Sequence, residues 1–86
     1  MLPVNIDFDE LSLETLEYYV KVFSDVYDHI IQVQRGWDTT ALRANSQYMY
    51  VIFAKNYNSV SHIIYNKESD ALRAALKEVL NRINNE

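Results

Sequence analysis

A long run of apolar residues with helical spacing, from Leu11 to Arg35, constrains the fold of this chain more than any other feature. One apolar line recurs every three or four residues, and a second line beside it widens the apolar band: Leu13, Leu16, Val20, Phe23, Tyr27 and Ile30, then Tyr19, Val22, Val26 and Val33. Ser12 is a suitable N-cap, and Gly36, the only glycine, follows Arg35 as at many helix C-termini. The pattern predicts one helix from Leu11 to Arg35.

The length of this predicted helix has a consequence for assembly. About 25 residues at 1.5 Å each extend over roughly 37 Å. A globule of 86 residues is only on the order of 30 Å across. A helix that overhangs its own domain leaves its apolar band uncovered, and a second copy of the chain is the simplest cover. We therefore expect a homodimer that pairs through this band.

The middle of the chain has the composition of strands. β-Branched and aromatic residues dominate from Gln47 to Ala54 and again from Val60 to Asn66, with a polar, turn-like cluster between them. Residues Thr39–Ala44 fit either a third strand or a short helix. A continuous helix from Thr39 to Tyr57 remains the alternative, because apolar residues within it also share one helical face.

The chain ends in a second helical pattern, with Ser69 as its predicted N-cap. Its apolar face is formed by Leu72, Ala75, Leu76, Val79, Leu80 and Ile83. The order helix, two or three strands, helix predicts an α+β fold with a small antiparallel sheet, and an all-α bundle is the alternative. A chain of 86 residues with one glycine and one proline has little room for a linker, so we expect residues 1–86 to form a single compact domain.

Composition limits where the protein acts. The sequence has no cysteine, so disulfides and thiolate ligands are excluded and a reducing compartment is favoured. No stretch approaches 18 uninterrupted apolar residues, and residues 1–7 do not resemble a signal peptide. We expect a cytoplasmic protein that does not enter a membrane.

The usual signatures of catalysis are missing from the sequence. His29 and His62 lack the helical His-x-x-x-His spacing of a metal site, and Ser61 beside His62 would point to the opposite face of a strand. One glycine cannot form a glycine-rich phosphate loop. We therefore expect no enzyme activity, no metal and no cofactor.

The predicted order of elements resembles the layout of double-stranded-RNA-binding domains, which end in a helix that begins with lysines. The matching stretch here is Lys67–Arg73, in which Glu68 and Asp70 interrupt the bases. The resemblance implies RNA binding through a basic face, for which the candidates are Arg35, Arg43, Lys55, Lys67 and Lys77. The first predicted helix is acidic, however, and phosphate contacts require basic side chains, so nucleic acid is not the expected partner.

Negative charge is concentrated in the first third of the chain. The net charge is −4, and residues 1–34 contain seven acidic residues and one lysine. An acidic stripe can resemble a row of phosphates, and aromatic side chains often anchor interfaces. We expect a small acidic module that binds a basic protein, with an inhibitor or regulator of a nucleic-acid-handling protein as its most specific form and a structural dimerisation or assembly subunit as the alternative. The candidate partner-binding residues are Glu10, Glu14, Glu17, Tyr18, Asp25, Asp28, Trp37 and Tyr57.

Overall fold

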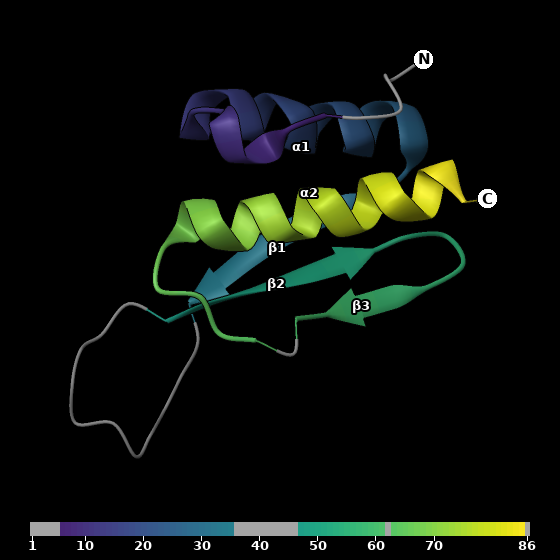
Figure 1. Ribbon diagram of the computed structural model, residues 1–86. Helices are drawn as coiled ribbons and strands as arrows, with labels where there is room; N and C mark the ends of the chain where they lie inside the picture. Colours follow the sequence, from purple (N-terminus) through teal and green to yellow (C-terminus); the bar gives the residue numbers. More distant parts are fainter. Residues whose placement is uncertain (1–5, 36–46, 62, 86) are drawn as a thin grey trace.

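The computed structural model describes residues 6–35, 47–61 and 63–85, and it confirms the predicted α+β fold. A short 3-10 helix and the first α-helix precede three strands, and a second α-helix follows them (Figure 1). The three strands form one antiparallel sheet in the order β1-β2-β3. The elements are η1 (Phe8–Glu10), α1 (Leu13–Tyr27), β1 (Ile30–Arg35), β2 (Tyr48–Phe53), β3 (Asn58–Val60) and α2 (Glu68–Asn84).

The first helix begins as predicted but ends eight residues early. The Ser12 hydroxyl accepts a hydrogen bond from the backbone N–H of Thr15 at 3.4 Å, as an N-cap does. Asp28 adopts the left-handed conformation, with φ 56° and ψ 35°, and its N–H donates to the carbonyl of Phe23. The N–H of His29 donates to the same carbonyl at 3.0 Å. The end of α1 is therefore at Asp28, not at Gly36, and the predicted helix from 11 to 35 is wrong beyond residue 27.

The residues after Asp28 form strand β1 because their side chains suit a sheet with one covered face. Ile31 is buried and Val33 half-buried on the side of the helices, whereas Ile30 is 49% exposed on the other side. Helix α1 has 15 residues, or roughly 22 Å at 1.5 Å each. The overhanging helix from which we expected a homodimer is therefore absent. Leu16 and Phe23 of its apolar band lie within the core, whereas Leu13 and Val26 are exposed.

The register of the sheet decides which residues face the helices. Ile31 lies opposite Ile52, and Ile30 lies opposite Phe53. The alternative prediction of a continuous helix over residues 39–57 is wrong, because residues 48–53 form strand β2. The candidate third strand or short helix at residues 39–44 lies outside the described residues.

The last strand is displaced from its predicted position. It comprises Asn58–Val60, whereas the sequence pattern predicts a strand over residues 60–66. Tyr65 instead forms an isolated antiparallel bridge with Tyr48, with N···O distances of 2.7 and 2.8 Å. The strand pairing of this segment is thus limited to short stretches.

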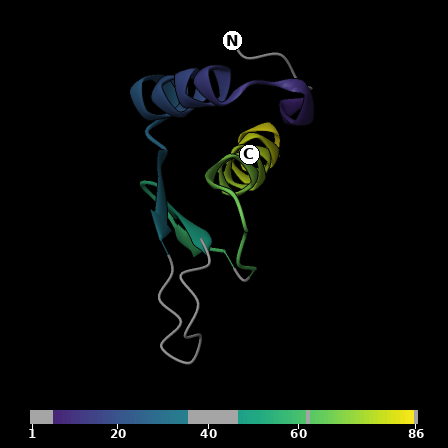
Figure 2. The same cartoon turned by 90° about the vertical axis from the view of Figure 1, so that its left-hand side faces the viewer.

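Helix α2 is the central element of the core. It packs against the sheet and against α1, and no described helix covers the opposite face of the sheet (Figure 2). Lys67 rather than Ser69 is its N-cap residue. The buried side chains of α2 are Ala71, Leu72, Ala75, Leu76, Val79 and Leu80, and they meet Phe8, Leu16, Phe23 and Ile52.

Neither described helix is long and apolar enough to cross a membrane.

Candidate functional site

Four of the predicted binding residues lie together on the outer face of α1, which we define by Glu14, Glu17, Tyr18 and Asp25, with Val26 at its border. This face lies opposite the fully buried Leu16 and Phe23. The three carboxylates are exposed, Tyr18 is 62% exposed and Val26 is 66% exposed. The surface therefore combines negative charge with exposed apolar and aromatic side chains.

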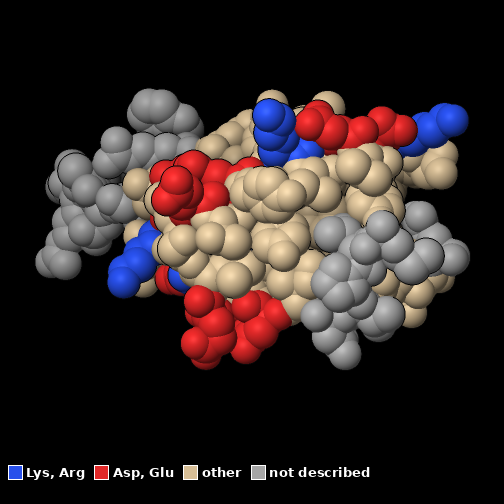
Figure 3. Space-filling view, turned by 90° about the horizontal axis from the view of Figure 1, so that it is seen from above, with Lys and Arg blue, Asp and Glu red and all other residues tan. Residues whose placement is uncertain are grey.

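The carboxylates of this face are not neutralised by ion pairs within the described part of the chain. Lys21 is spaced to pair with Glu17 or Asp25, but the structure closes neither pair. Among the described residues, α2 provides the basic member of each ion pair: Lys77–Asp9 at 2.8 Å, Arg73–Asp70 at 3.1 Å and Arg82–Glu78 at 3.5 Å. Viewed onto α1, acidic side chains form separate groups around an uncharged centre rather than one continuous stripe (Figure 3).

The remaining predicted binding residues lie elsewhere. Glu10 is exposed in η1, and Trp37 lies outside the described residues. Asp28 is exposed at the C-terminal end of α1. Tyr57 is half-buried, and the guanidinium of Arg82 lies 4.0 Å from the centre of its ring.

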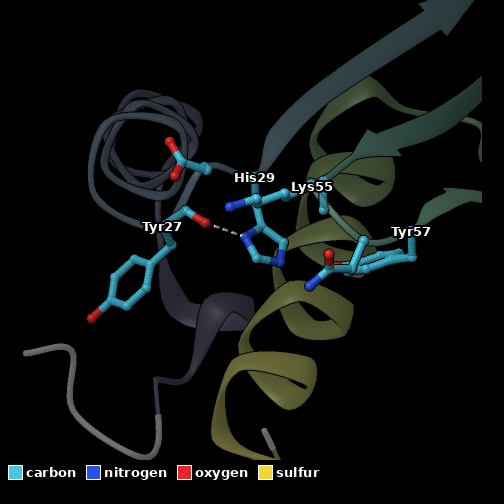
Figure 4. A pocket seen from close by; sticks show the side chains of 7 residues that line it. Tyr27, His29, Lys55 and Tyr57 are labelled. Carbon is cyan, nitrogen blue, oxygen red and sulfur yellow. Dashed lines mark hydrogen bonds between the residues drawn. The ribbon is translucent and has the colours of Figure 1, made fainter.

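Asp28 and Tyr57 line a pocket of about 170 Å³ between the end of α1 and the turn from β2 to β3. The other residues that line it are Tyr27, His29, Ala54, Lys55 and Asn56 (Figure 4). The His29 side chain is the most enclosed of them, because the residue is only 7% exposed. No sequence pattern indicates that Asp28 and Tyr57, 29 positions apart, lie beside the same histidine.

The hydrogen bonds of His29 fix the roles of its two ring nitrogens. Nδ1 lies 2.6 Å from the backbone carbonyl oxygen of Tyr27 (Figure 4). A carbonyl can only accept, so Nδ1 carries the proton and donates, and in the neutral ring Nε2 is left as an acceptor. Nε2 is buried and has no hydrogen-bond partner among the described residues. A buried acceptor of this kind is costly unless something donates to it.

A chain of polar contacts leads from this pocket into the interface between the sheet and α2. Arg82 stacks on Tyr57 and pairs with Glu78, and the Tyr50 hydroxyl donates to Glu78 Oε1 at 3.0 Å. Burial, the hydrogen bond to Glu78 and the charge of that carboxylate together raise the pKa of Tyr50 to about 12, with burial as the largest cause. These contacts anchor one wall of the pocket to α2.

A second exposed surface lies on the side of the sheet away from the helices. We call it the outer sheet face and define it by Ile30, Phe53, Val51 and Val60. Ile30 and Phe53 lie opposite each other, as do Val51 and Val60. Ile30, Phe53 and Val60 are 49%, 41% and 45% exposed, whereas Val51 is buried, with 9% exposed. The other described residues on this face carry no charge: Gln32, Gln34, Met49 and Asn58.

The described residues give no support to a metal centre. No group of three or more His, Cys, Asp or Glu side chains is close enough to share an ion in the described ranges. His29 and Asp28 are the ligand types present in the pocket, and two such groups fall short of the usual coordination.

The order of elements expected from the resemblance to double-stranded-RNA-binding domains is present, but the basic side chain of Arg73 at the start of α2 is bound within the protein. The order of elements and strands agrees with that layout. At the start of α2, however, Arg73 is held by Asp70 and by the carbonyls of Phe8 and Leu11 rather than directed to solvent. Comparison with protein-family models, curated proteins and solved structures finds no match to this chain.

Proposed function

We propose that the protein is a binding module for a basic protein and that the outer face of α1 is its contact surface. The observation that carries the proposal is the set of exposed carboxylates on this face, with which no basic side chain of the described structure forms an ion pair, although Lys21 lies on the same face. The exposed Tyr18 lies among them, and the exposed Val26 lies at the border of the face. Charge would orient a basic partner, and the apolar groups would supply contact area.

The spacing of the carboxylates supports a more specific form of the proposal. Glu14 and Glu17 are three residues apart on one helical face, which places their Cβ atoms roughly 5–6 Å apart. Such a spacing resembles that of charges along a nucleic-acid strand. A protein with this surface would occupy the basic site of a nucleic-acid-handling protein and act as its inhibitor or regulator.

Charge reversal on α1 tests this function. Wild type, Glu17→Lys and the matched control Glu68→Lys are used to capture proteins from lysate of the source cells. Glu68 is an exposed acidic residue at the start of α2, outside the proposed surface. We expect a basic protein retained by wild type and by the control, lost with Glu17→Lys, and released as salt rises from about 0.05 to 0.5 M. Retention of the basic protein by Glu17→Lys, or retention by wild type that does not decrease as salt rises, contradicts the proposal.

The outer sheet face favours a second candidate function, a self-assembling subunit. This face exposes Ile30, Phe53 and Val60 and contains no charged residue among those described, whereas the exposed carboxylates of Glu14, Glu17 and Asp25 lie on α1. Two copies of a protein with net charge −4 can therefore meet through this face with little charge repulsion. The candidate predicts a dimer with Phe53 at its interface, in place of the dimer through a long helix that the sequence suggested.

A further inference from the structure

We propose that Lys21 makes the outer face of α1 selective for a helix of the basic partner that has one acidic side chain between two basic ones. The inference rests on the proposed function, because it specifies the charge pattern of the partner that this face binds. Lys21 is exposed and lies near the centre of the face, four residues from both Glu17 and Asp25. The charges along this line of α1 are therefore negative, positive and negative rather than uniformly negative.

The Lys21 side chain is available to a partner. In the part of the chain that the structure describes, it forms no ion pair and no hydrogen bond, and the carboxylates of Glu17 and Asp25 on either side of it are exposed as well. Exposed ion pairs along one helix contribute little to stability, so these groups can exchange contacts with one another for contacts with a partner at small cost.

The spacing of the three charges favours a helical partner. Residues four apart on a helix are separated by about 6 Å along its axis, so Glu17 and Asp25 lie about 12 Å apart along α1 with Lys21 midway between them. A second helix with a charge at every fourth position has the same spacing. The order basic, acidic, basic complements α1 whether the two helices run parallel or antiparallel, because the pattern is the same from both ends.

An exposed aromatic ring beside these charges is held in place by the core. Tyr18 is 62% exposed, and its ring meets the ring of Tyr19 edge to face, with 5.6 Å between their centres. The Tyr19 ring in turn meets the ring of the fully buried Phe8 at 5.6 Å. A ring supported in this way loses little freedom when a partner covers it. Tyr18 would therefore supply contact area, while Lys21, three residues further along α1, selects the charge order.

The sign of the charge that faces Lys21 distinguishes two kinds of basic partner. A uniformly basic surface would place a cation against the Lys21 ammonium, and like charges brought together at an interface oppose binding. A carboxylate at that position would instead pair with the ammonium. Lys21→Glu should therefore strengthen the binding of a uniformly basic surface and weaken the binding of one with a central carboxylate.

Two helical peptides of equal length test the inference on the full chain. One has arginine, glutamate and arginine at every fourth position of an alanine-based helix, and the other has three arginines there. We expect wild type to bind the first about threefold more tightly in amide NMR titrations at about 0.05 M salt, although the second has the greater positive charge. Lys21→Glu should reverse this preference, and Lys21→Arg should keep it. Lys67→Glu, the matched control, makes the same charge change at the exposed N-cap of α2 and should leave the preference unchanged.

Equal affinity for the two peptides, tighter binding of the all-arginine peptide by wild type, or no binding of either peptide would overturn the inference. A preference that Lys21→Glu does not alter would overturn it as well. Capture of the partner with Glu17→Lys is the separate arm for the proposed function. If Glu17→Lys loses a basic protein that wild type retains, but wild type prefers the all-arginine peptide, the role of Lys21 fails alone. If Glu17→Lys retains that protein while wild type prefers the peptide with the central glutamate, the proposed function fails and the selectivity of Lys21 stands.

Discussion

Asp28 sets the path of the chain at the end of α1. It is the one described non-glycine residue with positive φ, a conformation that aspartate tolerates better than most residues. Only Asp28 and His29 separate α1 from β1, so this single backbone conformation turns the chain from the helix into the edge of the sheet. It also places His29 in the pocket and Asp28 beside it.

Tyr50 has a pKa raised by its surroundings, and it makes stability depend on alkaline pH. The folded protein raises the pKa of Tyr50 from 10.0 to about 12, so between these values the unfolded chain loses the phenolic proton first. The contribution of Tyr50 to stability is complete below pH 10 and is lost as pH rises toward 12.

We expect the free energy of unfolding of wild type to fall across this interval more steeply than that of Tyr50→Phe, as measured by urea unfolding at each pH. The phenolate absorbance of the native protein should also show one tyrosine that titrates later than the others. Parallel pH profiles for the two proteins would contradict this assignment.

At the scale of elements, Arg73 connects η1 to α2. Its Nε donates to the carbonyl of Phe8 at 3.2 Å and one terminal nitrogen to that of Leu11 at 3.0 Å, while the other pairs with Asp70. Phe8 is fully buried, so these bonds position a core residue whose own segment is only three residues long. Lys77 also reaches η1, but through an exposed ion pair with Asp9.

Arg73 and Lys77 both contact η1 from α2, so their variants allow a matched comparison. We expect Arg73→Ala to lower the free energy of unfolding by about 2 kcal/mol, because it leaves two carbonyls without a charged donor. Lys77→Ala should cost less than about 0.5 kcal/mol, since its ion pair is exposed to solvent. Chemical denaturation of both variants measures the difference. Equal losses would show that Arg73 does not join the two elements in the way described.

Local pattern was enough to predict the α+β class, the N-cap of α1 and the strand at residues 48–53. It failed at the boundary between α1 and β1, because Ile30 and Val33 continue the helical spacing as well as they fit a strand. The alternation of Ile31 and Val33 and the tolerance of Asp28 for positive φ were the available signals for a strand there. The pocket could not be predicted, because it depends on how Tyr57 and His29 meet after the sheet has paired.

For the whole molecule, the placement of both helices on one side of the sheet predicts association through the other side. We expect wild type to sediment at twice the 10.1 kDa of one chain at about 100 μM, because pairing would bury the outer sheet face. Phe53→Glu should sediment as a monomer, since it would bury an unpaired charge.

Tyr18→Glu provides the control for this experiment, because it makes the same kind of change on α1, outside the outer sheet face. It should leave the dimer intact. A monomeric wild type, or a dimer that Phe53→Glu leaves intact, would exclude this assembly. Circular dichroism of both variants checks that they remain folded.

Because both described helices pack on one face of the sheet, association through the other face would affect binding avidity. If two copies meet sheet to sheet, their α1 helices are directed away from the junction, and each assembled particle presents two separate acidic surfaces. Such a bivalent particle would bridge two molecules of its partner, or engage a repetitive partner at two points with a high effective concentration for the second contact. Weak individual contacts would then suffice for a long-lived complex.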